Sequence, residues 1–196
     1  MGRLTKNRNA NVLKGLAAGL IGGLLASWTM NRFQDLWFRT AEAGRTWSDN
    51  QFEDVWGELG EGVRESAITQ NSTLEAEVPD DTTVRAASAI SEGIFNHQLT
   101  PGEKKIAGPA VHYTLGTGVG GLYGAAAEMA PKVTAGLGLP FGAAFWLVVD
   151  EGAVPVLGLS KGPTAYPVST HVYALSSHFV YGLTAEVVRR VVRSAL

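Results

Sequence analysis

Four apolar stretches, each about as long as a membrane-spanning helix, limit the folds open to this chain. They are Val12–Met30, Ile106–Met129, Val133–Val149 and Tyr166–Val188. A helix that crosses a bilayer needs about 20 apolar residues, and in lipid every backbone polar group must find a partner within the protein. The third stretch is short and holds Pro140, so a kinked or re-entrant helix is an alternative for it. The pattern predicts an all-α fold, a transmembrane four-helix bundle.

The first stretch has a second interpretation, as a secretory signal peptide. Arg3, Lys6 and Arg8 precede it, as the basic residues of a signal peptide would. No A-x-A-like cleavage site follows it. We therefore expect a retained anchor, whose Lys14 reaches the headgroups at the inner end of the helix.

Basic residues predict which side of the membrane each end of the helices faces. They occur before the first stretch, at Lys132 between the second and third stretches, and at Arg189, Arg190 and Arg193 after the fourth. The positive-inside rule places these regions in the cytoplasm, so we expect a multi-pass protein with both termini cytoplasmic. The chain then divides into the first span with its N-terminus (1–30), an outer region (31–105) and three further spans (106–196).

The outer region is predicted to be an extramembrane helical cap on the outer side, between the first and second spans. Capping boxes occur at Ser48–Gln51 and at Thr100–Glu103, the second with a proline at N1. Apolar residues at helical spacing follow the first box from Phe52 to Val63, and they recur in Thr82–His97. The apolar face of that last helix consists of Val84, Ala87, Ile90 and Ile94. A cap that lies on the interface and a docking surface for a partner are both open.

Glycines recur at four-residue spacing in three of the stretches. They are Gly15, Gly19 and Gly23; Gly116, Gly120 and Gly124; and Gly138 and Gly142. Because lipid offers no hydrophobic drive between helices, such small faces let backbones approach and pack. We expect them to pack helices within the chain or between copies. The run Gly116–Gly121 also fits G-x-G-x-x-G, but it lacks the preceding strand and the later acidic residue of a dinucleotide site.

Polar residues at membrane depth are the candidate functional residues. The outer set consists of His112, Asp150, Glu151, His171 and His178. His178 follows His171 by seven residues, which places both on one face of a helix. Three interpretations stay open: structural hydrogen bonding, a proton or ion pathway, and a zinc site or a bis-histidine haem across spans two and four. No tight metal spacing such as H-x-x-x-H occurs, so no cofactor is predicted.

A second charged set lies at the expected inner ends of the spans. It consists of Glu128, Lys132, Glu186, Arg189 and Arg190. Opposite charges at the ends of neighbouring helices favour ion pairs. We expect an interfacial cluster that fixes the register of the helices, with no chemical role.

Charge and composition exclude several classes of function. A net charge of −2 gives no electrostatic footprint for nucleic acid. The absence of cysteine excludes disulfides, thiolate metal sites and cysteine nucleophiles. No Ser-His-Asp elbow, pair of catalytic carboxylates or phosphate loop occurs. We therefore do not expect an enzyme.

The second half of the chain resembles the YagU-like bacterial inner-membrane proteins. The matching residues in and after the second stretch are His112-Tyr113, Tyr123-Gly124 and Ala127–Val133. Those further along are Pro155–Leu159, Ser177–Phe179 and Glu186–Arg190. The resemblance implies a protein of the bacterial cytoplasmic (inner) membrane, from a family of unassigned molecular function, and it lends weight to His112, Glu128 and His178. Asp150-Glu151 stands near where the family pattern would have a histidine, which weakens a metal-site analogy.

For function, we expect an accessory or scaffold subunit that packs within a larger membrane assembly. Its partners would be the lipid bilayer and either other proteins or further copies of the chain. A small proton- or ion-handling membrane protein that uses the outer histidine and carboxylate set is the first alternative. A haem- or metal-binding membrane protein is the second.

Overall fold

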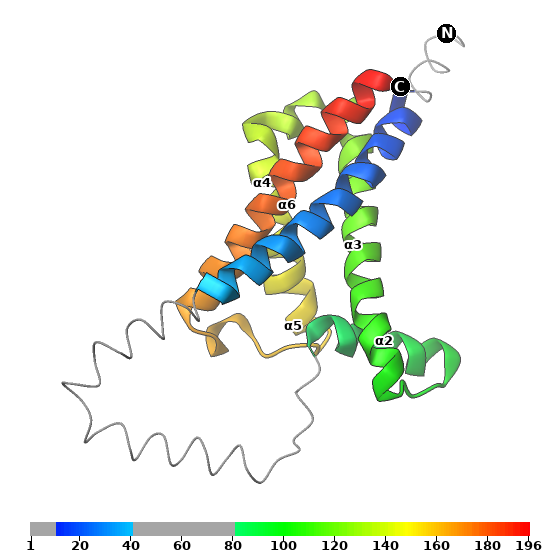
Figure 1. Ribbon diagram of the computed structural model, residues 1–196, viewed down its shortest axis with the longest axis vertical. Helices are drawn as coiled ribbons and strands as arrows, with labels where there is room; N and C mark the ends of the chain where they lie inside the picture. The colour runs from blue at the N-terminus through cyan, green and yellow to red at the C-terminus, as the bar shows by residue number, and fades with distance from the viewer. Residues whose placement is uncertain (1–10, 41–80) are drawn as a thin grey trace, which may run out of the picture. The chain divides into compact units, whose positions relative to one another are not determined.

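The computed structural model describes residues 11–40 and 81–196, and these are helical with no strand (Figure 1). The long helices are the N-terminal helix Asn11–Thr40, α2 Thr82–Phe95, α3 Pro101–Met129, α4 Leu139–Val148 and α6 Val168–Ala195. The short ones are the 3₁₀ segment η1 Pro131–Gly138, the π-helical segment η2 Val149–Ala153, α5 Val154–Val156 and the 3₁₀ segment η3 Pro163–Ala165. The all-α prediction is confirmed for the described residues. The capping box at Ser48–Gln51, the helix expected after it and the basic residues before Asn11 lie outside them.

Two segments are long and apolar enough to cross a membrane, as judged by length and composition. They are the N-terminal helix and the segment Pro131–Val156, which joins η1, α4, η2 and α5. The helices α3 and α6, with 29 and 28 residues, are long enough but more polar. The chain divides into two units, Met1–Phe33 with Thr82–Leu196, and Gln34–Asp81. All contacts described below lie within the first unit.

The N-terminal helix and α3 pack through two interlocking rows of glycine. A Cβ atom placed on Gly23 would lie 2.5 Å from the Gly116 carbonyl oxygen, and one placed on Gly120 would lie 2.5 Å from the Gly23 Cα. Further along, Gly15 and Gly19 meet the backbone of Gly124 in the same way. The two rows therefore associate within one chain, because only a residue without a side chain allows this approach.

The helices α4 and α6 pack through a second set of glycines. A Cβ atom on Gly182 would lie 2.9 Å from the Gly142 nitrogen, and Gly138 meets the same stretch of α6. Gly182 belongs to the packing face although the spacing of glycines in the fourth stretch gave no signal for it. The predicted pair Gly138 and Gly142 thus has its partner within the chain.

The turn before α4 is longer than the sequence indicated. The third span was expected to begin at Val133, directly after a turn around Pro131-Lys132, but the backbone is left-handed at Gly136, Leu137 and Gly138 (φ 70°, 57° and 82°). The helix α4 therefore begins at Leu139. Pro140 lies in its first turn, where a missing N–H costs nothing, so it starts the helix and does not kink it.

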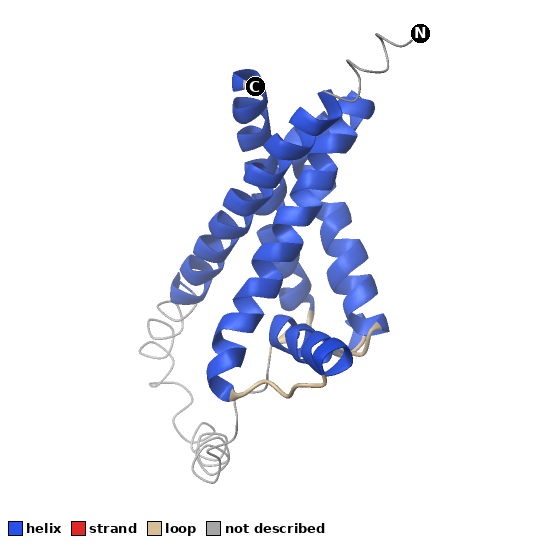
Figure 2. Ribbon diagram, turned by 90° about the vertical axis from the view of Figure 1, so that its right-hand side faces the viewer, coloured by secondary structure: helices blue, strands red, loops and turns tan. Residues whose placement is uncertain are grey.

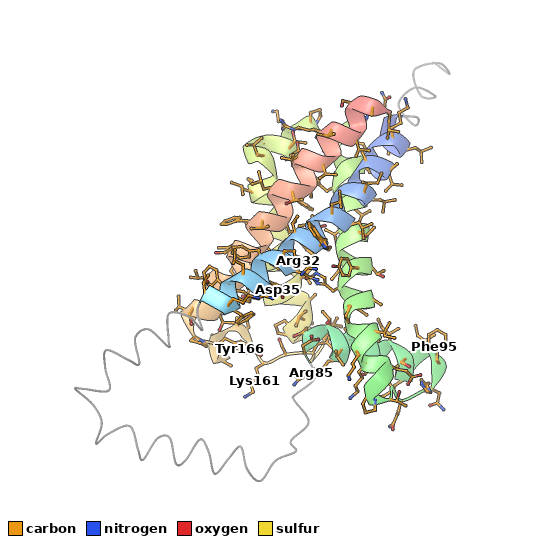
Figure 3. All side chains as sticks on the ribbon, in the orientation of Figure 1. Arg32, Asp35, Arg85, Phe95, Lys161 and Tyr166 are labelled. Atoms are coloured by element: carbon orange, nitrogen blue, oxygen red, sulfur yellow. The ribbon has the colours of Figure 1, made fainter. Side chains whose placement is uncertain are left out.

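The helix α2 packs on the beginning of α3, which the capping box at Thr100 and Glu103 starts as predicted. Ala87 and Ser91 are buried, and the Val84 side chain lies against Gly108. Ile90 and Ile94, which were predicted to share an apolar face with Val84 and Ala87, are exposed, as is Phe95 at the end of the helix (Figure 3). The side of α2 that packs on α3 is therefore marked by Val84, Ala87 and Ser91.

The N-terminal helix begins and α6 ends at the same end of the bundle, here called the terminal end (Figure 1). The Arg193 guanidinium donates to the Asn11 side-chain oxygen at 3.4 Å, and the Lys14 ammonium donates to the Leu196 carbonyl at 2.5 Å. The helix α3 also ends there, because Arg193 binds Glu128. The opposite end, called the distal end, carries α2 and the loop between α5 and α6 (Figures 1 and 2).

Small and polar side chains predominate among the buried residues of this bundle. The residues buried between helices are mostly small or polar, among them Ala18, Ala26, Ser27, Ser177, His178 and Glu186. Large apolar residues point outward from every long helix. Examples are Leu13, Leu122, Leu147 and Val191, which are 65%, 68%, 59% and 65% exposed.

Candidate functional site

The π-helical segment η2 presents two adjacent carboxylates, Asp150 and Glu151, to α6. Its widened turn is closed by the N–H of Val154, which donates to the carbonyl of Val149 five residues earlier. Such a turn inserts an extra residue into a helix and frequently marks a functional site. Because α4 and α6 are antiparallel, the earlier carboxylate reaches deeper into the bundle than the later one.

Glu151 and His171 form the shorter of the two contacts. The His171 Nδ1 lies 2.6 Å from a Glu151 oxygen, and the His171 Nε2 lies 3.1 Å from the Pro163 carbonyl oxygen. The two side chains are 15% and 26% exposed. His171 therefore connects three elements: η2, the turn η3 and α6.

Asp150 and His178 form a looser contact deeper in the bundle. The Asp150 carboxylate lies 3.7 Å from the His178 Nδ1, which also lies 2.9 Å from the Ala174 carbonyl one turn back in α6. Since a carbonyl can only accept, that nitrogen carries a proton and donates to Ala174. The His178 side chain is 5% exposed and the Asp150 side chain 39%.

The structure divides the predicted outer set into pairs. His112 lies on α3, where its ring meets that of Tyr113 edge-on with centroids 5.6 Å apart. Among the described residues, no three His, Asp or Glu side chains lie close enough together to hold one metal ion. The arrangement brings together Asp150 with His178 and Glu151 with His171, and only the second pair is joined by a hydrogen bond.

A layer of aromatic rings separates these pairs from the terminal end. Phe145 meets the His178 ring edge-on at 5.2 Å and lies 5.1 Å from the Tyr181 ring, while Phe141 stacks on Tyr123 at 4.0 Å. The Tyr181 hydroxyl, almost fully buried, donates to the Gly116 carbonyl at 2.5 Å. The sequence contained a signal for this layer in the i, i+4 spacing of the two phenylalanines, but it predicted no partners for them.

Beyond the aromatic layer, Glu186 is a fully buried carboxylate with three hydrogen-bonding partners. Arg189 donates to both of its oxygens at 2.8 and 2.9 Å, Arg190 donates at 2.5 Å, and the Tyr123 hydroxyl donates at 2.9 Å. Charge-assisted bonds of this kind offset the cost of removing the carboxylate from water.

Glu128 forms a separate ion pair with Arg193 at 2.7 Å, and this contact raises the pKa of Arg193 above its ordinary value. The predicted inner cluster is therefore present as two groups around Glu186 and Glu128. Lys132 is exposed and belongs to neither of these ion pairs. Tyr123 and Arg193 are members that the predicted set lacked.

Residues 89–187 match a family model described as "Protein of unknown function (DUF1440)". Comparison with the curated proteins found no match, and comparison with the solved structures found none. The matched range contains α3, α4, η2 and most of α6, with both histidine–carboxylate pairs and Glu186. Since it covers just over half of the sequence, this chain belongs to the DUF1440 family of proteins of unknown function.

Proposed function

We propose that this protein is a four-pass protein of the bacterial inner membrane, and that its bundle serves as an accessory or scaffold subunit of a larger membrane assembly. In this proposal the chain carries out no chemical step of its own. The resemblance of its second half to the YagU-like inner-membrane proteins supports the location.

The observation that carries the proposal is the outward exposure of large apolar side chains. In water, the buried positions of a helical bundle attract Leu, Ile, Val and Phe, and exposed apolar patches larger than a few hundred Å² mark membrane or protein contacts. Here the interior holds glycine, alanine, serine and paired charges, whereas Leu122 and Leu147 are more than half exposed. Packing through small residues and internal hydrogen bonds is what helices use when lipid surrounds them.

The sidedness of the proposal rests on the basic residues of the terminal end. The terminal end carries the arginines of α6 and Lys14, so the positive-inside rule places it in the cytoplasm. The distal end also carries Arg85, Lys104, Lys105 and Lys161, but the first three belong to the long region between the first and second spans, to which the positive-inside rule applies weakly. The distal end, with α2 and the histidine–carboxylate pairs, then faces the outer side. In this orientation α3 and α6 are spans that hold their polar groups inside the bundle, which offsets the cost of those groups in lipid.

The surfaces that are already used within the chain support the scaffold role. The glycine rows pack helices within the chain, so they are occupied and do not serve association between chains. The buried charges of the terminal end are paired with one another. Of the surfaces of the described bundle, the apolar outer faces are therefore available to bind other proteins.

Site-specific photo-crosslinking in native membranes tests this role. A photo-reactive amino acid would replace Leu122 on α3, Leu147 on α4 or Val187 on α6, all of which point outward. Ala185, which is 1% exposed on α6, is the matched inward control. The chain would be expressed at native abundance, and the adducts would be identified by mass spectrometry.

A scaffold subunit predicts that one outward face gives adducts with the same identified protein, while the other outward faces give lipid adducts. The inward position should crosslink only within the chain. Lipid adducts at all three outward positions, together with migration as a lone monomer after gentle solubilisation, would remove the proposal.

A further inference from the structure

The number of protons held between Glu151 and His171 follows from the hydrogen bonds of the histidine ring. The Pro163 carbonyl can only accept, so the His171 Nε2 that faces it at 3.1 Å must carry a hydrogen. The other nitrogen, Nδ1, faces a carboxyl oxygen at 2.6 Å. That contact needs a hydrogen as well, carried either by Nδ1 as an imidazolium or by Glu151 as a carboxylic acid.

Removing this one proton breaks one of the two contacts. A neutral imidazole carries a single hydrogen. If it stays on Nε2, the lone pair of Nδ1 faces an ionised Glu151; if it moves to Nδ1, the lone pair of Nε2 faces the Pro163 carbonyl. In both arrangements two hydrogen-bond acceptors face each other with no hydrogen between them. His171 can therefore bind η2 and η3 at the same time only while the extra proton is present.

The pair of Asp150 and His178 does not depend on an extra proton in this way, so it serves as the reference for the pair of Glu151 and His171. The His178 Nδ1 donates to Ala174 whether the ring is neutral or charged, and Asp150 lies 3.7 Å away. Other charged or titratable groups in the surrounding elements are Asp150 in η2, His178 in α6, Lys161 and Tyr166 in the loop between α5 and α6, and Arg85 in α2, whose guanidinium donates to the Leu159 carbonyl of that loop at 3.3 Å. In that loop the backbone N–H of Lys161 donates to the Tyr166 hydroxyl at 3.2 Å (Figure 3). The helix α4 contributes Trp146, whose ring meets His171 edge-on.

The aromatic layer limits where such a proton can go. From His178 toward the terminal end, the next side chains are Phe145 and Phe141, which carry no exchangeable proton, and Tyr181, whose hydroxyl is committed to the Gly116 carbonyl. The aromatic rings therefore lie between the histidine–carboxylate pairs and the terminal end, and we call this layer the blind end of the site.

We propose that Glu151, His171 and the Pro163 carbonyl form a binding site for a single proton at the distal end, and that this proton fastens the turn η3 and the segment η2 to α6. With the proton bound, the turn η3 is held against α6; with the proton lost, η3 is released, while Arg85 still holds the beginning of the loop at Leu159. The statement that the site opens to the outer side rests on the membrane orientation proposed above. The proton count and the fastening do not.

Nuclear magnetic resonance of the full chain in detergent micelles tests the site without reference to a membrane side. Imidazole ¹⁵N shifts of His171 report the proton, and backbone ¹⁵N order parameters of Thr164 and Ala165 report the loop. We expect those order parameters to fall from about 0.85 to below about 0.6 as the pH is raised and the proton leaves. The order parameter of Gly120 within α3 should not change over the same range.

Three variants distinguish an effect of the proton on loop order from an effect of side-chain packing alone. In Glu151→Gln, the amide N–H₂ donates to a neutral Nδ1 while Nε2–H still donates to Pro163, so the loop stays ordered at every pH. In His171→Phe, the loop is mobile at every pH. In Asp150→Asn, the matched control next door, the pH dependence is kept.

Loop order that is independent of pH in the unaltered chain, or a pH response unchanged by Glu151→Gln, would overturn the proton site. The outer-side assignment is tested separately in proteoliposomes. There, spin-labelled Thr164→Cys should respond to the pH on the distal side alone. A response to the pH of the terminal side would overturn the orientation and the blind end but leave the proton count standing.

Discussion

Replacing Gly120 by alanine should separate the N-terminal helix from α3. The added Cβ would lie 2.5 Å from the Gly23 Cα and 2.8 Å from the Gly23 nitrogen, whereas carbon atoms in contact prefer about 3.5–4.0 Å. The two helices must therefore move apart by about 1 Å. A gap of that size forfeits roughly a quarter to a half of the contact energy along the row, and overpacking of this kind costs about 1–3 kcal/mol.

Gly118 provides the matched control, because it lies on the same helix and a Cβ there meets nothing within 4 Å. Alanine raises helix propensity by up to about 1 kcal/mol at either position, so the difference between the two variants isolates the steric term. We expect Gly120→Ala to be less stable than Gly118→Ala by about 2 kcal/mol, a factor of roughly 30 in the ratio of folded to unfolded protein.

Equilibrium unfolding in mixed micelles, with increasing sodium dodecyl sulfate and tryptophan fluorescence as the signal, measures this difference. Trp28 is one of five tryptophans in the chain and lies on the N-terminal helix, so the fluorescence follows unfolding of the bundle as a whole. Equal midpoints for the two variants would refute the packing of these helices through their glycine rows.

Three further changes test the buried polar groups and the cap of α3. Glu186→Ala should destabilise the bundle by about 3–5 kcal/mol in the same unfolding assay, because it leaves a buried arginine without its counter-charge; a loss below about 1 kcal/mol would contradict the buried cluster. Tyr181→Phe should cost about 1–3 kcal/mol, since the Gly116 carbonyl loses its buried donor, and an unchanged midpoint would argue against that bond. Hydrogen bonds from Thr100 lower the pKa of Glu103 below its ordinary 4.5, so the cap is fully stabilising above that pH and is lost as the pH falls through the folded-state pKa. Amide exchange in the first turn of α3 should therefore accelerate in acid, and it should not do so in Glu103→Gln.

The all-α class, the glycine faces of the helices and the beginning of α3 follow from local patterns. The sequence was therefore sufficient to predict them. Apolar runs of spanning length fix helices in lipid, and a four-residue repeat places Gly116, Gly120 and Gly124 on one face whatever lies opposite. The reciprocal bonds of Thr100 and Glu103 are local as well, which is why the start of α3 was predicted to the residue.

The pairing of helices and the geometry of the outer site depend on distant contacts, and the sequence did not determine them. The left-handed residues before Leu139 had a signal in Gly136, Gly138 and Pro140, but the apolar character of the stretch concealed it. The π turn carries no composition of its own. Without that turn nothing indicated that Asp150 and Glu151 would reach two different histidines.

Sedimentation of membranes washed with alkaline carbonate, without detergent, tests most directly whether lipid is the solvent around this bundle. The outward apolar faces predict that all of the protein stays in the pellet and enters the supernatant only when detergent is added. Release of the chain into the carbonate supernatant as a folded protein would contradict the account.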